Sequence, residues 1–136
     1  MWQFLQIKST TCGWATGFDA SCPFALEVAQ MTLNEYQQWQ QTMAFYPQKK
    51  EFEGLVYTIL AMGGEAGEVQ NDLKKIIRDY KGIIVPETRQ KLLYELGDVL
   101  WYISAATSEL ESSLQEIADL NISKLERRRS EDKPVG

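Results

Sequence analysis

Four carboxylates, arranged in two pairs, are the residues of this sequence best suited to chemistry. Glu65 and Glu68 form one pair, and Glu95 and Asp98 form the other. The acids of each pair are three positions apart, a spacing that places both on one face of a helix. The sequence around both pairs is otherwise apolar, so the acids are expected to be partly buried. Because an unpaired buried carboxylate is costly or becomes protonated, four of them on adjacent helices predict a shared cation.

Oxygen-only ligands indicate which cation this would be. Carboxylates suit Mg²⁺, for which Mn²⁺ can substitute, and Mg²⁺ keeps water or substrate phosphates in its remaining positions. Such a site is typical of enzymes that act on phosphate esters. The chain has no histidine, so acid/base work falls to carboxylates. Once three acids hold the metal, the fourth could orient or deprotonate the attacking water. The alternative is that the acids are ordinary solvated helix charges, which the apolar surroundings disfavour.

Basic, amide and aromatic side chains could complete such a site. Trp39 and Tyr102 could stack on a nucleobase, although packing in the core is the commoner role of an aromatic side chain. Asn121 is expected on the inward face of its helix, where an amide needs a partner from the protein or from a ligand. Two basic groups could reach phosphates, although cations are also common near helix C-termini for structural reasons. These groups are Lys74, Lys75 and Arg78, and Lys124, Arg127, Arg128 and Arg129.

Helical periodicity and local stop signals predict the elements that position these residues. Helices are expected over about 32–45, 52–80, 87–109 and 113–129, and an all-α, four-helix bundle-like fold follows. Residues 83–85 give the one short strand signal after residue 30. Gly63 and Gly64 could mark a kink, a close approach of a helix or ligand, or a simple packing accommodation. The last helix is expected to bury the stripe Leu114, Ile117, Ala118, Leu120/Asn121 and Leu125, with Ser112 or Ser113 as its N-cap.

Length and composition bound the domain organisation. A chain of 136 residues is expected to form one helical domain over 31–129, preceded by an extension of unclear structure over 1–30 and followed by a polar tail over 130–136. Cys12 and Cys22 match no metal or redox spacing. The net charge of −5 argues against a nucleic-acid partner. No apolar run is long enough for a membrane span, so a cytoplasmic location is expected. The abundance of apolar side chains in so small a chain predicts a homo-oligomer.

Three segments, residues 64–69, 95–102 and 121–128, together resemble the MazG-like nucleoside triphosphate pyrophosphohydrolases. The motifs are Glu-x-x-Glu, Glu-x-x-Asp and Asn-x-x-Lys-Leu-x-x-Arg in that order, and the likeness covers about residues 31–129. The resemblance implies an all-α fold that assembles as dimers or tetramers. It also implies Mg²⁺-dependent hydrolysis of a (deoxy)nucleoside triphosphate to the monophosphate and pyrophosphate, by attack at the α-phosphorus.

The resemblance also implies roles for particular residues. Asn121, Lys124 and Arg128 would contact phosphate or sugar, and Lys75 is a less secure match. Gly64 stands where many members carry an additional acid, whose role is either missing here or supplied by Asp72. The metal ligands would be Glu65, Glu68, Glu95 and Asp98.

The function expected from the sequence is therefore house-cleaning of the nucleotide pool by pyrophosphate release, with Glu65 or Glu68 as the expected base for the attacking water. Two alternatives remain open at this stage. One is a pyrophosphatase specific for the deoxypyrimidine nucleotides dUTP or dCTP, since such enzymes share the acidic cradle. The other is a non-catalytic helical module that senses nucleotides or binds a partner, in which the carboxylates serve only charge networks.

Overall fold

The computed structural model describes residues 31–131. The predicted extension over 1–30, with Cys12 and Cys22, and residues 132–136 of the predicted tail lie outside the described residues. From Leu33 onward the described residues belong to one compact unit.

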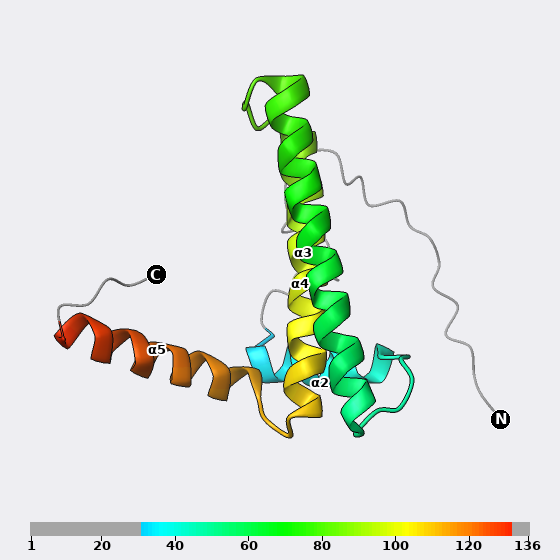
Figure 1. Ribbon diagram of the computed structural model, residues 1–136, viewed down its shortest axis with the longest axis vertical. Coiled ribbons are helices and arrows are strands. Elements are labelled where there is room, and N and C mark those ends of the chain that lie inside the picture. The colour runs from blue at the N-terminus through cyan, green and yellow to red at the C-terminus, as the bar shows by residue number, and fades with distance from the viewer. Residues whose placement is uncertain (1–30, 132–136) are drawn as a thin grey trace. The chain divides into compact units, whose positions relative to one another are not determined.

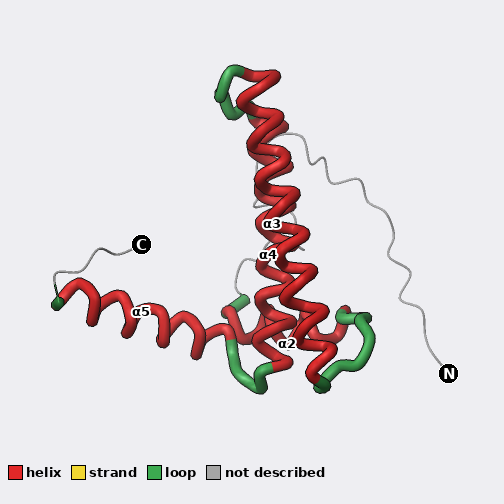
Figure 2. Tube along the Cα trace, in the orientation of Figure 1, coloured by secondary structure: helices red, strands yellow, loops and turns green. Residues whose placement is uncertain are grey.

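Four helices make up this unit, in agreement with the predicted all-α class (Figure 1). They are α2 (Leu33–Met43), α3 (Phe52–Tyr80), α4 (Pro86–Glu109) and α5 (Leu114–Ser130). Each begins and ends within two residues of its predicted bounds. Residues 31–131 contain no strand (Figure 2), so the short strand signal at residues 83–85 does not lead to one and the all-α prediction is confirmed. These residues link α3 to α4, where a three-residue segment has no strand to pair with.

α3 and α4 pack against each other along their length as an antiparallel hairpin (Figure 1). The turn is made by Lys81 and Gly82, which both adopt positive φ, at 54° and 79°. The Gly82 N–H donates to the Ile76 carbonyl at 3.1 Å, which closes the end of α3. Pro86 begins α4, where its fixed φ suits the first turn and its missing N–H costs nothing. The hairpin is therefore specified by local turn chemistry.

α2 lies across the end of the hairpin, and α5 then leaves it (Figure 1). α2 contacts α4 and α5, while α5 contacts α2 and α4 but not α3. The inward stripe predicted for α5 is therefore largely wrong within a single chain. Leu114 is buried, but Ile117 is 38% and Leu120 63% exposed, and Asn121 is exposed as well. One chain by itself does not close the helices into a four-helix bundle.

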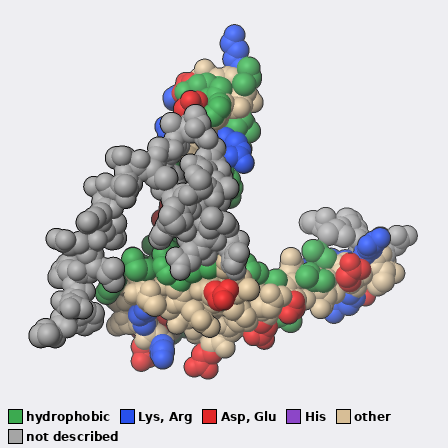
Figure 3. All heavy atoms as spheres, turned by 180° about the vertical axis from the view of Figure 1, so that it is seen from behind, with side chains coloured by type: hydrophobic (Ala, Val, Ile, Leu, Met, Phe, Trp, Pro, Cys, Tyr) green, Lys and Arg blue, Asp and Glu red, His purple; other side chains and the backbone are tan. Residues whose placement is uncertain are grey.

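The buried interior is small and unusually polar. Among the described residues the buried apolar side chains are Ala44, Ile76, Ala105, Ala106 and Leu114. The buried polar ones are Gln37, Gln40, Thr58, Thr88, Ser104 and Thr107. Several of the buried hydroxyls donate a hydrogen bond to a backbone carbonyl of their own helix, as when Thr58 Oγ1 donates to the Leu55 carbonyl at 2.9 Å. Much apolar surface therefore stays exposed, some of it visible as green side chains in Figure 3.

α3 runs as one continuous helix through Gly63 and Gly64. A Cβ built at either position would meet nothing within 4 Å among the described residues. A close approach within this unit therefore does not explain either glycine. No helix of the described residues combines the length and apolar character that crossing a bilayer requires.

Candidate metal centre

Three of the four predicted acids meet where α3 and α4 face each other. One carboxylate oxygen from each of Glu65, Glu95 and Asp98 lies within 4.8 Å of the other two. We call these three residues the acidic cluster. Glu65 and Glu95 are half-buried and Asp98 is exposed. Opposite ligands of octahedral Mg²⁺ are about 4.2 Å apart, since each bond is about 2.1 Å. Small side-chain rotations would therefore bring the oxygens to a cation, and the donor set fits a hard divalent ion.

The cluster carries negative charge that the described part of the chain does not neutralise. The pKa of Glu65 is raised above its ordinary value, first by burial and then by the charge of Asp98, followed by Glu95 and Glu68. The ion pairs within the described residues, Lys75 with Asp72 and Arg78 with Asp79, do not include a cluster acid. A bound cation would relieve this repulsion.

Glu68, the fourth predicted acid, lies outside the cluster. It is one turn further along α3 and exposed. Its charge nevertheless reaches its neighbours, because it contributes to the raised pKa values of both Glu65 and Lys75. Asp72, which was considered as a substitute for the acid missing at Gly64, forms an ion pair with the ammonium of Lys75.

Two tyrosines from different helices lie near the cluster. The pKa of Tyr36 on α2 is raised by burial and then by the charge of Asp98. The pKa of Tyr102 on α4 is raised by burial first, then by Tyr57, and then by Glu65. α2 therefore brings Tyr36 towards Asp98, which lies sixty-two positions later in the chain.

Trp39 and Tyr102, the aromatic residues predicted to contact a base, both lie near the tyrosines beside the acidic cluster. Trp39 is 45% exposed and packs at a tilt against Tyr36, with ring centroids 5.8 Å apart. Sequence reasoning missed Tyr36 and Tyr57. The available signals were weak: Tyr36 is three positions before Trp39, and Tyr57 is two turns before Glu65 on the same helix.

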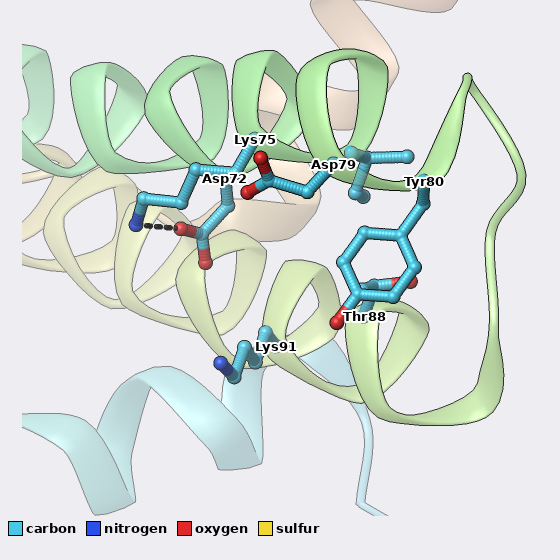
Figure 4. A pocket seen from close by; sticks show the side chains of 7 residues that line it. Asp72, Lys75, Asp79, Tyr80, Thr88 and Lys91 are labelled. Atoms are coloured by element: carbon cyan, nitrogen blue, oxygen red, sulfur yellow. Dashed lines mark hydrogen bonds and ion pairs between the residues drawn. The ribbon is translucent and has the colours of Figure 1, made fainter.

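Lys75 lies in a small pocket between the C-terminal half of α3 and the start of α4 (Figure 4). The pocket has a volume of about 130 Å³, whereas sites for drug-sized ligands have about 300–1,000 Å³. Figure 4 shows Lys75 turned to Asp72, with Lys91 of α4 across the pocket and Tyr80 beside Thr88. This pocket alone is too small to hold a nucleotide.

The three predicted substrate contacts of α5 are not brought to the cluster within one chain. Asn121 and Lys124 are exposed and line a shallow depression on α5, and Arg128 is half-buried further along. α5 makes no contact with α3, which carries Glu65. If these side chains serve the same site as the acids, a second copy must supply them.

Comparisons with known proteins add independent information. The family model described as the MazG nucleotide pyrophosphohydrolase domain matches residues 56–131. The chain is also similar to the Gene 37 protein of Mycobacterium phage L5, with 38% identity over 102 residues that cover 73% of this chain and 90% of the phage protein. No solved structure gives a significant match. The matched family region contains the acidic cluster, Glu68 and the α5 residues.

Proposed function

Because the chain belongs to the MazG nucleotide pyrophosphohydrolase domain family, we propose that it hydrolyses (deoxy)nucleoside triphosphates to the monophosphate and pyrophosphate with Mg²⁺. The observation that carries this proposal is the convergence of Glu65, Glu95 and Asp98, none of which forms an ion pair with a lysine or arginine among residues 31–131. A triphosphate is polyanionic, so acids of this kind can serve it only through a cation. The proposed setting is the cytoplasmic nucleotide pool.

The acids of the cluster are proposed to hold Mg²⁺, or Mn²⁺ in its place. The ion would supply positive charge to the phosphate oxygens and lower the pKa of water beside it. Glu68 is the preferred base, because it lies one turn from Glu65 but outside the cluster and is exposed. It would take a proton from the water that attacks the α-phosphorus while the bond to the pyrophosphate leaving group breaks. Glu65 remains the alternative base.

The substrate is proposed to lie along the aromatic side of the cluster. Trp39 and Tyr102 offer ring faces for a base, and Tyr36 lies near enough to Asp98 for the charge of this acid to raise its pKa. Phosphate contacts are assigned to the cationic and amide side chains of α3 and α5, namely Lys75, Asn121, Lys124 and Arg128.

A homo-oligomer is proposed because no other described helix covers the apolar face of α5 and the hairpin leaves apolar side chains exposed. Leu60 and Ile77 of α3 are 71% and 64% exposed, and Leu120 of α5 is 63% exposed. α5 ends in the basic run 127–129, which complements the negative acidic cluster. We propose that α5 of one copy lies across the α3–α4 hairpin of the next, as a dimer or as part of a tetramer.

The test is release of pyrophosphate from a panel of canonical and modified nucleoside triphosphates, with and without Mg²⁺. Turnover of several substrates that needs Mg²⁺ and is lost in Asp98→Asn is the expected result. Turnover of dUTP or dCTP alone would favour the deoxypyrimidine-specific alternative. No turnover, combined with no Mg²⁺-dependent rise in Tm on adding triphosphate, would favour the non-catalytic module.

A further inference from the structure

The start of α5 is held by side chains of α2. The first N–H groups of a helix have no partner within the helix. Here Leu114 N–H donates to Gln37 Oε1 at 2.8 Å, and Gln115 N–H donates to Asn34 Oδ1 at 3.2 Å. The third, Glu116 N–H, is capped at 3.1 Å by Ser113 Oγ. Two of the three groups are therefore satisfied by another helix, seventy-seven and eighty-one positions earlier in the chain.

Gln37 is held in one position by its burial and its hydrogen bonds. We call Gln37 and Asn34, with the first turn of α5 that they cap, the joint. Its side chain is only 6% exposed, and its amide also donates to Ser108 Oγ at 3.0 Å and to the Ser112 carbonyl at 2.9 Å. A carbonyl must face the Leu114 N–H and an NH₂ must face the Ser112 carbonyl, so only one orientation of the amide satisfies both. Gln37 thus joins α2 to the end of α4, to the connection after it and to the first turn of α5.

The direction of α5 depends on this joint. α5 has no contact with α3, and only Leu114 at its start is fully buried. The side chains proposed for phosphate lie two to four turns further along, so a small rotation at the start moves them by several ångströms.

We infer that Gln37 and Asn34 are positioning residues for the reaction, which set the direction of α5 and so place Asn121, Lys124 and Arg128 against the substrate. The inference rests on the proposed function. The acidic cluster is built from α3 and α4 and does not use the joint. Loss of the joint therefore weakens substrate binding and leaves the metal site intact.

Kinetics of single variants test this inference. Gln37→Ala and Asn34→Ala are expected to raise KM for the triphosphate about tenfold and about threefold, with kcat within twofold and the Kd for Mn²⁺ unchanged. Asn34→Asp keeps the accepting oxygen and is expected to behave as the parent protein. Gln38→Ala, an exposed position on the same helix, is the matched control. Unchanged KM in both alanine variants, or an equal loss of Mn²⁺ affinity, would overturn the inference.

A direct measurement of α5 separates this inference from the proposed function. Spin labels are placed at Gln90→Cys on α4 and Ser123→Cys on α5, both exposed, with Cys12 and Cys22 changed to serine and unlabelled protein added in excess. Double electron–electron resonance should give a narrow distance distribution in the parent, Asn34→Asp and Gln38→Ala, and a broader one in Gln37→Ala and Asn34→Ala. Equal widths throughout would refute the joint even in an active enzyme. An inactive parent with the expected broadening would refute the proposed function, and with it the role of the joint in the reaction, while the structural role of Gln37 and Asn34 in directing α5 would stand.

Discussion

The three acids of the acidic cluster are held close together although their charges repel. Burial and three neighbouring carboxylates raise the pKa of Glu65, so the metal-free site is electrostatically unfavourable. A cluster that serves binding should cost stability when empty. A cluster that serves only to stabilise the fold should not lower the stability of the metal-free protein.

Asp98→Asn tests this distinction. The variant is expected to lower kcat by at least about a hundredfold and to weaken Mn²⁺ binding, because it removes a charged ligand. The Tm of its metal-free form should rise by about 1–5 °C, because repulsion on Glu65 is relieved. Calorimetry with and without Mn²⁺ measures both effects. Glu126→Gln, which changes an exposed acid of α5, controls for net charge. A fall in the Tm of metal-free Asp98→Asn, in place of the expected rise, would contradict the assignment.

Glu68→Gln separates the base from the ligands. Since Glu68 lies outside the cluster, its loss is expected to lower kcat by about a hundredfold while the Kd for Mn²⁺ rises less than threefold. Isothermal titration with Mn²⁺ and initial rates under saturating substrate give the two numbers. A loss of Mn²⁺ affinity as large as that of Asp98→Asn would make Glu68 a ligand instead.

The pH dependence of stability follows from Glu65. Its pKa in the folded protein lies above the ordinary value of 4.5, so the native state holds the proton more tightly than the unfolded chain. Glu65 therefore lowers the free energy of unfolding as the pH rises from about 4.5 to the pKa that Glu65 has in the folded protein. At higher pH its effect on the free energy of unfolding no longer changes. The difference in Tm between metal-free parent and Glu65→Gln should grow over this interval. Mn²⁺ affinity should weaken as pH falls through the same interval, because protons compete for the carboxylate.

At the scale of elements, the hairpin is anchored where the α2–α3 connection meets the end of α4. Glu109 accepts from the Tyr46 hydroxyl and, at 2.7 Å, from the Lys50 N–H. Tyr46 stacks on Tyr57 with centroids 5.8 Å apart. Gly54 is buried against this anchor, where a Cβ would lie 2.5 Å from the Gln48 carbonyl oxygen.

Gly54→Ala is therefore expected to destabilise the fold by about 1–3 kcal/mol, because a backbone carbonyl must move to admit the methyl group. Chemical denaturation measures the change. Gly63→Ala on the same helix is the control, since its Cβ would meet nothing within 4 Å among the described residues. If Gly54→Ala is neutral, the packing of this connection against α3 is not as described.

At the scale of the whole molecule, the question is which copy supplies α5 to a given acidic cluster. Within one chain α5 does not touch α3, and its apolar face is largely exposed. A shared site predicts that two inactive variants with complementary defects rescue each other.

Asp98→Asn mixed with the double variant Lys124→Ala/Arg128→Ala provides this test. Each protein alone is expected to be inactive. After dissociation and reassociation in equal amounts, half of the dimers are mixed and each mixed dimer has one intact site of two, so about one quarter of parental activity should return. Analytical ultracentrifugation confirms reassociation. Recovery of no activity in confirmed mixed dimers would show that α5 serves its own chain.

The sequence by itself determined the helices and their ends. Hydrophobic periodicity and the residues that start or stop a helix decide these features, because a proline or a glycine acts on the backbone within one turn. Pro47 follows the first helix, Lys81 and Gly82 make the turn of the hairpin, and Ser113 caps α5. The spacing of the acid pairs was also visible, since three positions bring side chains to one helix face.

Only the tertiary structure decided which of these side chains meet. Helical spacing leaves the rotation of each helix about its axis undefined, and packing of α3 on α4 selected Glu65, Glu95 and Asp98 while leaving Glu68 outside. Packing of α2 brought Tyr36 to the cluster and Gln37 to the start of α5, across separations at which sequence carries no pairing signal. The physical reason is that local sequence fixes a helix as a rigid element, whereas its direction and rotation depend on contacts between residues far apart in the chain.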